Sequence, residues 1–182
     1  MLLRMATPAD IGALLDIYDS AHKWLAKRGT DQWQEPRLEP ELMKAAILAA
    51  VHNRETWCAI DERERHAGLV IVKERTPPGL WLPEEEAEPH RYAYLALVSR
   101  EHTGLGLGTD LIEWATNRAA AAGARWLRGD VWTDNKPLQD YYLRNGWEFV
   151  RTVHRPDQPS GVLVQRRAEP RETPRLVEVS DT

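Results

Sequence analysis

A glycine-rich turn, Thr103-Gly-Leu-Gly-Leu-Gly108, is the segment of this sequence with the clearest capacity for binding chemistry. It follows an apolar run, Tyr92 to Val98, and precedes a helical pattern that ends near Gly123. Glycines at this density expose backbone N–H groups, and the positive end of the following helix lies at the same place. A strand, such a turn and a helix therefore predict a site for a phosphate group.

The glycine spacing argues against two familiar nucleotide sites. A dinucleotide turn reads Gly-x-Gly-x-x-Gly, whereas Gly104, Gly106 and Gly108 alternate here and Thr109 stands where the third glycine belongs. Asp130 lies at a suitable distance for a ribose-binding acid, but too few strands follow for a second nucleotide-binding half. A triphosphate loop is excluded because no Gly-Lys-Ser/Thr follows. Coenzyme A and a turn without a ligand remain.

A second block, from Val131 to Phe149, carries an Asn, a short helical segment with a Tyr, and a Gly followed by an aromatic residue. Taken in order with the glycine turn, this block resembles the GNAT superfamily of acyl-CoA-dependent N-acyltransferases. The coenzyme motif of that family reads Arg/Gln-x-x-Gly-x-Gly/Ala after a strand that ends in Val. The matching positions are Val98, Thr103, Gly106, Gly108, Asn135, Tyr142, Gly146 and Trp147. The resemblance covers residues 2–167 by element order, and its specific motifs lie between residues 92 and 149.

Thr103 departs from the family pattern, which has Arg or Gln at this position. The main grip on pyrophosphate in such sites comes from backbone N–H groups and the helix dipole, so the resemblance still implies acetyl-CoA as co-substrate. Arg100 or His102 could supply a charge instead, or be plain exposed residues. The coenzyme-binding residues that the resemblance implies are Leu97, Val98, Thr103, Gly104, Leu105, Gly106, Leu107, Gly108, Thr109 and Asn135.

The resemblance also implies the chemistry, which is transfer of an acetyl group to a primary amine by direct attack in a ternary complex. The backbone N–H of Leu97 or Val98 would stabilise the oxyanion. Tyr142 occupies the family's position for the general acid that protonates the departing thiolate, and we interpret Tyr141 as a packing residue. Asn135 suits a helix N-cap as well as a contact to the coenzyme arm. A non-catalytic acyl-CoA-binding module of the same fold stays open as the alternative.

The acceptor site depends on loops, which carry less readable patterns. Asp130, near the end of a predicted strand, is the first candidate for general base or substrate anchor, and a solvent-facing or turn-capping carboxylate is the alternative. In the family, the region between the first two helices lines the acceptor site. Asp31, Gln32 and Trp33 are therefore candidates for binding substrate, although Trp33 could instead pin its loop to the core. Further wall candidates are Tyr94 and Trp132. The acceptor is expected to be a small-molecule amine or a peptide N-terminus.

The single cysteine, Cys58, gives no support to an acyl-cysteine mechanism, because it lies in a predicted strand and no histidine has a spacing that implies pairing. The six histidines show no metal-ligand spacing, so we expect no metal. The acidic run from Glu84 to Glu88 could attract a cationic amine, but a solvated loop is the plainer interpretation.

Hydrophobic periodicity predicts the elements that position these residues. Strands are expected over residues 2–5, 56–61, 67–73, 92–98, 126–132, 147–153 and 161–165. Helices are expected over residues 7–29, 40–52, from the glycine turn to 123, and 135–145. This order predicts an α/β (α+β) fold with a mixed, mostly antiparallel sheet of about seven strands flanked by about four helices, as in GNAT proteins. The domain is expected over residues 1–167, followed by a charged, mobile tail over residues 168–182.

Composition limits the partners of the chain. With 182 residues, 42% hydrophobic and 29% charged, it suits one globular domain, and a net charge of -4 argues against nucleic acid as the main partner. The apolar runs are too short to span a bilayer and the N-terminus has no signal-peptide pattern, so we expect no membrane and a cytoplasmic location. One cysteine excludes an internal disulfide. The last strands and the tail could join a partner subunit, so a homodimer stays open.

Overall fold

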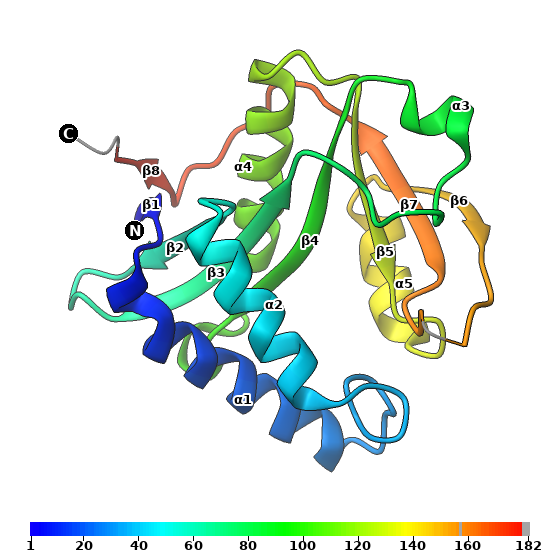
Figure 1. The fold of residues 1–182 in the computed structure, drawn as a ribbon. Coiled ribbons are helices and arrows are strands. Elements are labelled where there is room, and N and C mark those ends of the chain that lie inside the picture. Colours follow the sequence, from blue (N-terminus) through cyan, green and yellow to red (C-terminus); the bar gives the residue numbers. More distant parts are fainter. Residues whose placement is uncertain (157, 180–182) are drawn as a thin grey trace.

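The computed structural model describes residues 1–156 and 158–179, which form one eight-stranded sheet with helices on both faces (Figure 1). The strands are β1 (Leu2–Met5), β2 (Thr56–Ile60), β3 (His66–Lys73), β4 (His90–Val98), β5 (Trp126–Val131), β6 (Glu148–Thr152), β7 (Val162–Arg167) and β8 (Val177–Glu178). Their order across the sheet is β6-β7-β5-β4-β3-β2-β1-β8. Among these described strands, only the pairs β4–β5 and β1–β8 are parallel.

Helices cover the two faces of the sheet and divide its core in two. The helical segments are η1 (Pro8–Asp10), α1 (Ile11–Lys27), α2 (Pro40–His52), α3 (Pro83–Glu86), η2 (Arg100–His102), α4 (Leu107–Ala121) and α5 (Lys136–Arg144). On one face, α1 and α2 pack against side chains such as Leu95 and Leu97 of β4. On the other, α4 packs against residues such as Val70, and Ala96 and Val98 of β4 point to this side. Successive β4 side chains therefore face opposite helical layers.

The sheet opens between β4 and β5. These two strands pair only over His90–Tyr92 and Trp126–Arg128, whereas β4 continues beside β3 as far as Val98. β5 continues beside β7 as far as Val131. The second halves of β4 and β5 thus separate. The edge of β4 that faces β5, and the edge of β5 that faces β4, no longer pair with each other there. This opening is the structural feature that positions the candidate site.

A β-bulge at Tyr94 accompanies the opening. Leu95 is opposite Ile71 of β3 while Ala93 is opposite Val72, so Tyr94 is the extra residue on β4. A bulge of this kind bends its strand and increases the local twist, and it re-aims the side chain that it carries. The Tyr94 side chain consequently faces the α1–α2 side together with its neighbour Leu95.

The acidic insertion before β4 packs against the sheet through ion pairs. It contains the short helix α3, which a loop prediction did not include. The Glu85 carboxylate accepts hydrogen bonds from both Nη groups of Arg151 at 2.6 and 2.7 Å. Glu88 pairs with the fully buried Arg128 at 2.9 Å. These carboxylates are therefore committed to arginines of the sheet rather than solvated.

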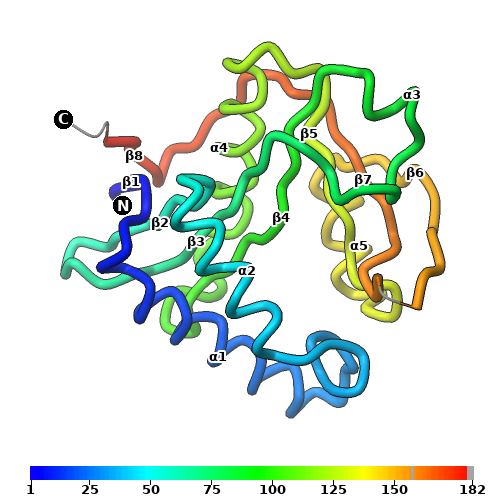
Figure 2. The backbone as a smooth tube through the Cα atoms, viewed as in Figure 1, coloured from blue at the N-terminus to red at the C-terminus, as the bar shows by residue number. Residues whose placement is uncertain are grey.

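The C-terminal segment returns to the N-terminus. The sequence predicts a mobile tail over residues 168–182, of which 180–182 lie outside the described residues. Val177–Glu178 forms β8 beside β1, as Figure 2 also shows, and Glu178 accepts a hydrogen bond from Trp114 Nε1 at 2.7 Å. Leu176 is buried against the α4 layer. The eighth strand comes from this docking, and loose docking is the alternative to mobility that the charged, proline-broken sequence leaves open.

The predicted fold class is confirmed, with a mixed and mostly antiparallel sheet between two helical layers. The predicted helix over residues 40–52 matches α2. Within the described residues, the helices all fall short of the length and apolarity required to cross a membrane.

Candidate active site

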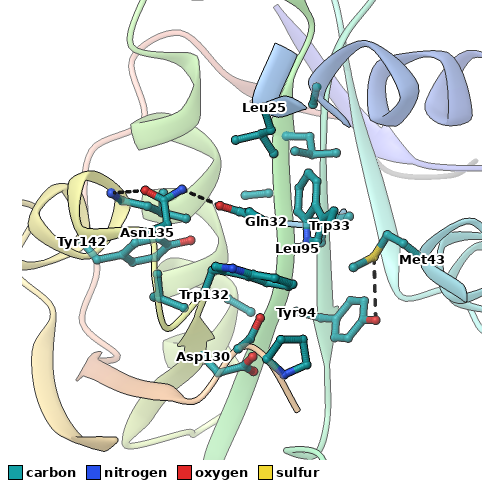
Figure 3. Close-up of a pocket in the computed structure, with 18 of the residues that line it drawn as sticks. Leu25, Gln32, Trp33, Met43, Tyr94, Leu95, Asp130, Trp132, Asn135 and Tyr142 are labelled. Atoms are coloured by element: carbon teal, nitrogen blue, oxygen red, sulfur yellow. Dashed lines mark hydrogen bonds between the residues drawn. The ribbon is translucent and has the colours of Figure 1, made fainter. Parts of the chain in front are cut away.

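A cavity of about 620 Å³ occupies the opening between β4 and β5. Its walls come from the second half of β4, the end of β5, the start of α5, the helices α1 and α2 with the loop between them, and the loop before β7. Side chains from both helical layers meet there (Figure 3). Both helical layers therefore contribute walls to this cavity.

The glycine turn lies where β4 ends and α4 begins. Gly104 has φ +81° and Gly106 has φ +78°, a left-handed conformation that side chains other than glycine rarely adopt. Gly106 is the N-cap of α4, which starts at Leu107. The first N–H groups of a helix have no partner within it, so this turn presents donors and the positive helix end together. The arrangement suits a pyrophosphate, as the spacing predicts.

Backbone alternation along β4 determines which amide faces the opening. The N–H of Ser99 donates to Ala67 O of β3 at 2.8 Å. Because backbone groups alternate in direction along a strand, Leu97 also faces β3, while Val98 and Ala96 face away from it. Of the two predicted oxyanion donors, Val98 is thus the one whose N–H points into the opening.

Asp130 on β5 faces the cavity between Trp132 and Tyr94 (Figure 3). Burial raises the pKa of this carboxyl to about 7, while hydrogen bonds from Gln158 and Ser160 oppose the rise. The Gln158 Nε2 to Asp130 Oδ2 distance is 3.4 Å. A carboxylate with this pKa is matched to accepting a proton near neutral pH.

Tyr142 on α5 also faces the cavity, and its hydroxyl points toward Trp132 in Figure 3. Its ring packs edge-on against Trp147 with centroids 5.2 Å apart. Burial raises the pKa of the Tyr142 hydroxyl, and the neighbouring Tyr141 and Asp130 raise it further, so the group stays protonated at neutral pH. Tyr141 bonds Thr109 Oγ1 at 3.0 Å instead, which links α5 to the start of α4.

Two hydrogen bonds connect the α1–α2 loop to the strand–helix junction after β5. Trp132 Nε1 donates to Asp31 Oδ1 at 2.7 Å, and Asn135 Nδ2 donates to Gln32 Oε1 at 2.5 Å. The Asn135 side chain also accepts from the Leu138 N–H at 3.1 Å, as expected of an N-cap. The predicted N-cap is confirmed, and Asn135 also lines the cavity, where its contact to the coenzyme arm stays a prediction.

Trp33 and Tyr94 form apolar walls. Trp33 has φ +59° and is nearly buried, with its ring 5.4 Å from that of Tyr18. It lines the cavity and pins its loop to the core at the same time. The Tyr94 hydroxyl donates to Met43 Sδ at 3.9 Å (Figure 3).

The structure brings most of the predicted site residues to one cavity. The lining residues among them are Gln32, Trp33, Tyr94, Leu97, Val98, Thr103, Asp130, Trp132, Asn135 and Tyr142. Residues 104–109 do not line this cavity, but form the turn and helix start directly after its Thr103 wall. Leu107 has its side chain buried in the core, so its backbone alone is available to a ligand. Asp31 lies behind Trp132 and holds its indole.

Several cavity residues carry no signal in the sequence as site residues. On the α1–α2 side they are Trp24, Leu25, Leu38 and Met43. The helical spacing of Trp24, Leu25 and Met43 predicts core packing, and Leu38 lies in the loop between α1 and α2. The opening of the sheet turns one side of this core into a wall. Gln158, Pro159 and Ser160 lie in a loop whose return to Asp130 has no periodicity to reveal it.

The family model described as the Acetyltransferase (GNAT) family matches residues 18–147, which include the glycine turn and all the cavity walls except the loop before β7. The chain belongs to the GNAT acetyltransferase family. It is therefore a transferase, and the resemblance that its motifs predict is confirmed.

Individual relatives of this GNAT protein are distant. The chain is 25% identical over 133 residues to the uncharacterized N-acetyltransferase YesJ of Bacillus subtilis (strain 168), covering 70% of this chain and 71% of that protein. A GNAT-family acetyltransferase structure from Listeria monocytogenes superposes with a TM-score of 0.73 at 20% identity over 91% and 93% of the two chains. The PaiA N-acetyltransferase of Thermoplasma acidophilum, solved in complex with coenzyme A, superposes with a TM-score of 0.68 at 15% sequence identity. The match covers 91% of this chain and 97% of that chain. These structures share the GNAT fold.

A variant of the coenzyme turn tests its register in this GNAT protein. Thr103→Arg restores the long cation of the family motif and is expected to lower the Kd for coenzyme A about three- to tenfold, since charge-assisted bonds to phosphate are strong. Calorimetric titration measures the change. Leu42→Arg on the exposed side of α2 adds the same charge elsewhere and should leave the Kd unchanged. Weaker binding by Thr103→Arg would mean that residue 103 does not face the phosphates.

Cys58 lies on β2, which β3 separates from β4 and the opening. Its side chain is fully buried, and burial raises the pKa of the thiol to about 11, so little thiolate forms at neutral pH. Cys58→Ala is expected to keep kcat/KM within about twofold, because a buried thiol of this kind is inert. Steady-state rates check this, and a large loss of rate with an acylated Cys58 in wild-type mass spectra would instead indicate an acyl-enzyme.

A possible metal-ligand set, Asp10, Cys58 and His66, lies away from the cavity with its ligand atoms within 4.8 Å of one another. Arg4 donates to both Asp10 oxygens at 2.8 and 2.7 Å, and His66 Nε2 is 2.8 Å from Asp10 Oδ1. The Arg4 guanidinium, with help from Thr7 and His66, holds the pKa of Asp10 well below its usual range. These contacts account for the burial of the carboxylate as part of the turn before α1.

Proposed function

We propose that this protein transfers an acetyl group from acetyl-CoA to a primary amine, by direct attack of the amine in a ternary complex. The observation that carries the proposal is the convergence of Asp130 and Tyr142 on one cavity that opens beside the Val98 amide. Asp130 has the pKa of a base at neutral pH, and Tyr142 that of an acid which stays protonated. A base and an acid in one cavity suit the transfer of an acyl group from sulfur to nitrogen, because the nitrogen must lose a proton and the sulfur must gain one.

The residues present fit coenzyme A. The turn over residues 103–109 would hold the pyrophosphate through its N–H groups and the start of α4. The free edge of β4 would pair with the amides of the pantetheine arm, because Ala96 and Val98 direct their backbone groups into the opening. Acetyl-CoA supplies an acetyl group on a thioester, a reactive acyl donor.

Three groups of the chain would carry the proton and charge transfers. Asp130 takes the proton from the attacking amine as the C–N bond forms, and the Val98 N–H donates to the oxygen that becomes negative. Tyr142 donates its proton to the thiolate as the C–S bond breaks. The products are then the amide and the free thiol of the coenzyme, and the two residues exchange protons with water before the next turnover.

A non-catalytic acyl-CoA-binding module would have the same coenzyme features without a working acceptor site. Titration with coenzyme A, followed by assay of free thiol from acetyl-CoA with a panel of primary amines, separates the two. Binding together with amine-dependent thiol release supports the proposed transfer. Binding without thiol release for any amine would favour the module, and no binding would overturn both.

A further inference from the structure

The acceptor side of the cavity is an aromatic and apolar chamber. The two sides of β4 divide the cavity, since Ala96 and Val98 face the α4–α5 layer and Leu95 and Leu97 face the α1–α2 layer. The coenzyme would approach from the first side, where the glycine turn and Tyr142 lie. The acceptor is left with the second side, whose walls are Trp24, Leu25, Trp33, Leu38, Met43, Tyr94 and Trp132.

Charged groups are scarce on these walls. Among the cavity-lining residues that the structure describes, Asp130 is the one acid and Arg100 the one Arg or Lys. Arg100 follows β4 in the segment that leads to the glycine turn, and its guanidinium lies over the Trp24 ring, 4.6 Å from the centroid. The walls around Asp130 thus combine a mainly aromatic and aliphatic surface with a single carboxylate and a few uncharged polar side chains, which are Gln32, Asn135, Gln158 and Ser160.

This arrangement selects for one kind of amine. An ammonium group beside Asp130 would lie near the Trp132 ring, which attracts cations (Figure 3), whereas the Tyr94 ring already has Lys73 Nζ 4.1 Å from its centroid. The group attached to it must then meet Met43, Trp33 and their apolar neighbours. A carboxylate on the acceptor would repel the Asp130 carboxylate, and a second ammonium would lie in an apolar wall without an acid.

We propose, on the basis of the transfer function proposed above, that the acceptor is a primary amine on an aromatic or bulky apolar group that carries no carboxylate. Amino acids, polyamines and peptide N-termini are poor acceptors, because each brings charges or amides that these walls leave unpaired. The wall chemistry thus narrows the acceptor to small arylalkyl or branched alkyl amines.

Four amines test the acceptor class. We expect kcat/KM for 2-phenylethylamine to exceed that for phenylalanine, spermidine and a phenylalanyl dipeptide by at least about tenfold each. A higher value for any of the other three would overturn the acceptor class while leaving the transfer function intact. Thiol release with none of the amines would overturn the function and the class together.

A pair of neighbouring variants tests the walls. Met43→Gln keeps the length of the side chain but adds an amide, and should raise KM for 2-phenylethylamine about three- to tenfold with KM for acetyl-CoA unchanged. Leu42→Gln, on the exposed side of the same helix, should change neither. Equal KM values for Met43→Gln and wild type would show that the aromatic group does not meet this wall.

A second inference comes from the C-terminal tail, which reaches the glycine turn. Arg175 Nε donates to Asp110 Oδ2 at 2.5 Å, and its Nη1 donates to Leu105 O. A Cβ placed on Gly106 would be 2.7 Å from Arg175 Nη2, so the guanidinium lies directly against the start of α4. The Met1 amino group donates to Arg175 O at 2.9 Å and fixes the tail at this point.

The contact between Arg175 and Asp110 affects the charge beside the glycine turn. Asp110 lies in the first turn of α4 and is almost fully buried, so it places a negative charge beside the turn that would bind pyrophosphate. Arg175 neutralises this charge, and its side chain remains half exposed on the same side. Thr103 supplies no cation of its own. The GNAT family match ends at residue 147, so Arg175 lies outside the shared motifs.

We infer that Arg175 is a positioning residue for the coenzyme phosphates, acting by cancelling the charge of Asp110 and holding the Leu105 carbonyl. This inference also depends on the proposed function. Arg175→Ala should raise KM for acetyl-CoA about tenfold, because it leaves a carboxylate unpaired beside the phosphates. Adding Asp110→Asn to that variant should bring KM for acetyl-CoA most of the way back to the wild-type value.

S-acetylpantetheine separates an effect on phosphates from a general loss of structure, because it has the thioester but no phosphate. Arg175→Ala should leave KM for this donor unchanged, and Arg171→Ala, which removes a tail arginine paired with Glu113, should leave both KM values unchanged. An equal rise for both donors, or no rescue by Asp110→Asn, would overturn the inference. Measurable wild-type turnover keeps such a result distinct from a failure of the transfer function.

Discussion

Asp130→Asn is expected to lower kcat/KM for amine acetylation by about 100- to 10,000-fold, the usual contribution of a positioned general base. Asparagine keeps the shape of the side chain but cannot accept the amine proton. The coenzyme approaches from the other side of β4, so its Kd should change little. Steady-state rates and calorimetry measure the two quantities, and Asp134→Asn, an exposed acid four residues later on the same chain segment, serves as the control.

The pH profile carries the signature of the same carboxyl group. The pKa of Asp130 is about 7, so kcat/KM should rise as pH increases to about 7, where the carboxylate forms, and then level off until the amine loses its own proton. In Asp130→Asn this acid limb should disappear. A wild-type profile without an inflection near pH 7, or a variant that keeps one, would contradict the assignment of Asp130 as base.

Asp130→Asn should make the folded protein more stable although it lowers the activity. The folded-state pKa lies above the unfolded value, so the folded protein binds the extra proton and wild-type stability falls as pH rises from about 4 to about 7. Asparagine carries no charge to bury, so Asp130→Asn should increase the free energy of unfolding at pH 8 by on the order of 2 kcal/mol. Denaturant unfolding at pH 8 and pH 4 tests this, with a smaller difference expected at pH 4.

Tyr142→Phe has the second-largest expected effect, a fall in kcat of about 100-fold with a nearly unchanged Kd for coenzyme A. Phenylalanine keeps the packing on Trp147 but cannot donate a proton to the thiolate. Tyr141→Phe is the matched comparison, because Tyr141 lines the same cavity but its hydroxyl bonds Thr109 Oγ1 at 3.0 Å. A wild-type rate for Tyr142→Phe, or a larger loss for Tyr141→Phe, would remove Tyr142 from the mechanism.

The coenzyme half of this account was predictable from sequence, because it depends on contiguous patterns. The alternating glycines require a left-handed turn at Gly104 and Gly106, and the following apolar periodicity requires a helix there. Helical spacing places Tyr142 on α5, and the resemblance of the Asn135 to Trp147 block to the GNAT family is what distinguishes it from Tyr141. Backbone donors need no particular side chain, so the glycines predict a phosphate site, and the second block is needed to favour coenzyme A over a turn without a ligand.

The acceptor half was only partly predictable, because it depends on where distant segments meet. The strand position of Asp130 makes it a candidate, but its raised pKa results from burial, and the Gln158 and Ser160 side chains that reach it come from a distant loop. Met43 has the spacing of a core residue, and the bulge at Tyr94 is what brings the two side chains into contact. Arg175 lies in a polar segment whose docking depends on pairing with β1, a contact between opposite ends of the chain.

Direct detection of the product is the measurement that tests the central claim most directly. The protein is incubated with acetyl-CoA labelled with ¹³C in the acetyl group and with 2-phenylethylamine, and both the free thiol and the N-acetylated amine are quantified over time. The account predicts one labelled amide for each thiol released, with both lost together in Asp130→Asn. Thiol release without amide, or bound coenzyme with neither product for any primary amine, would contradict it.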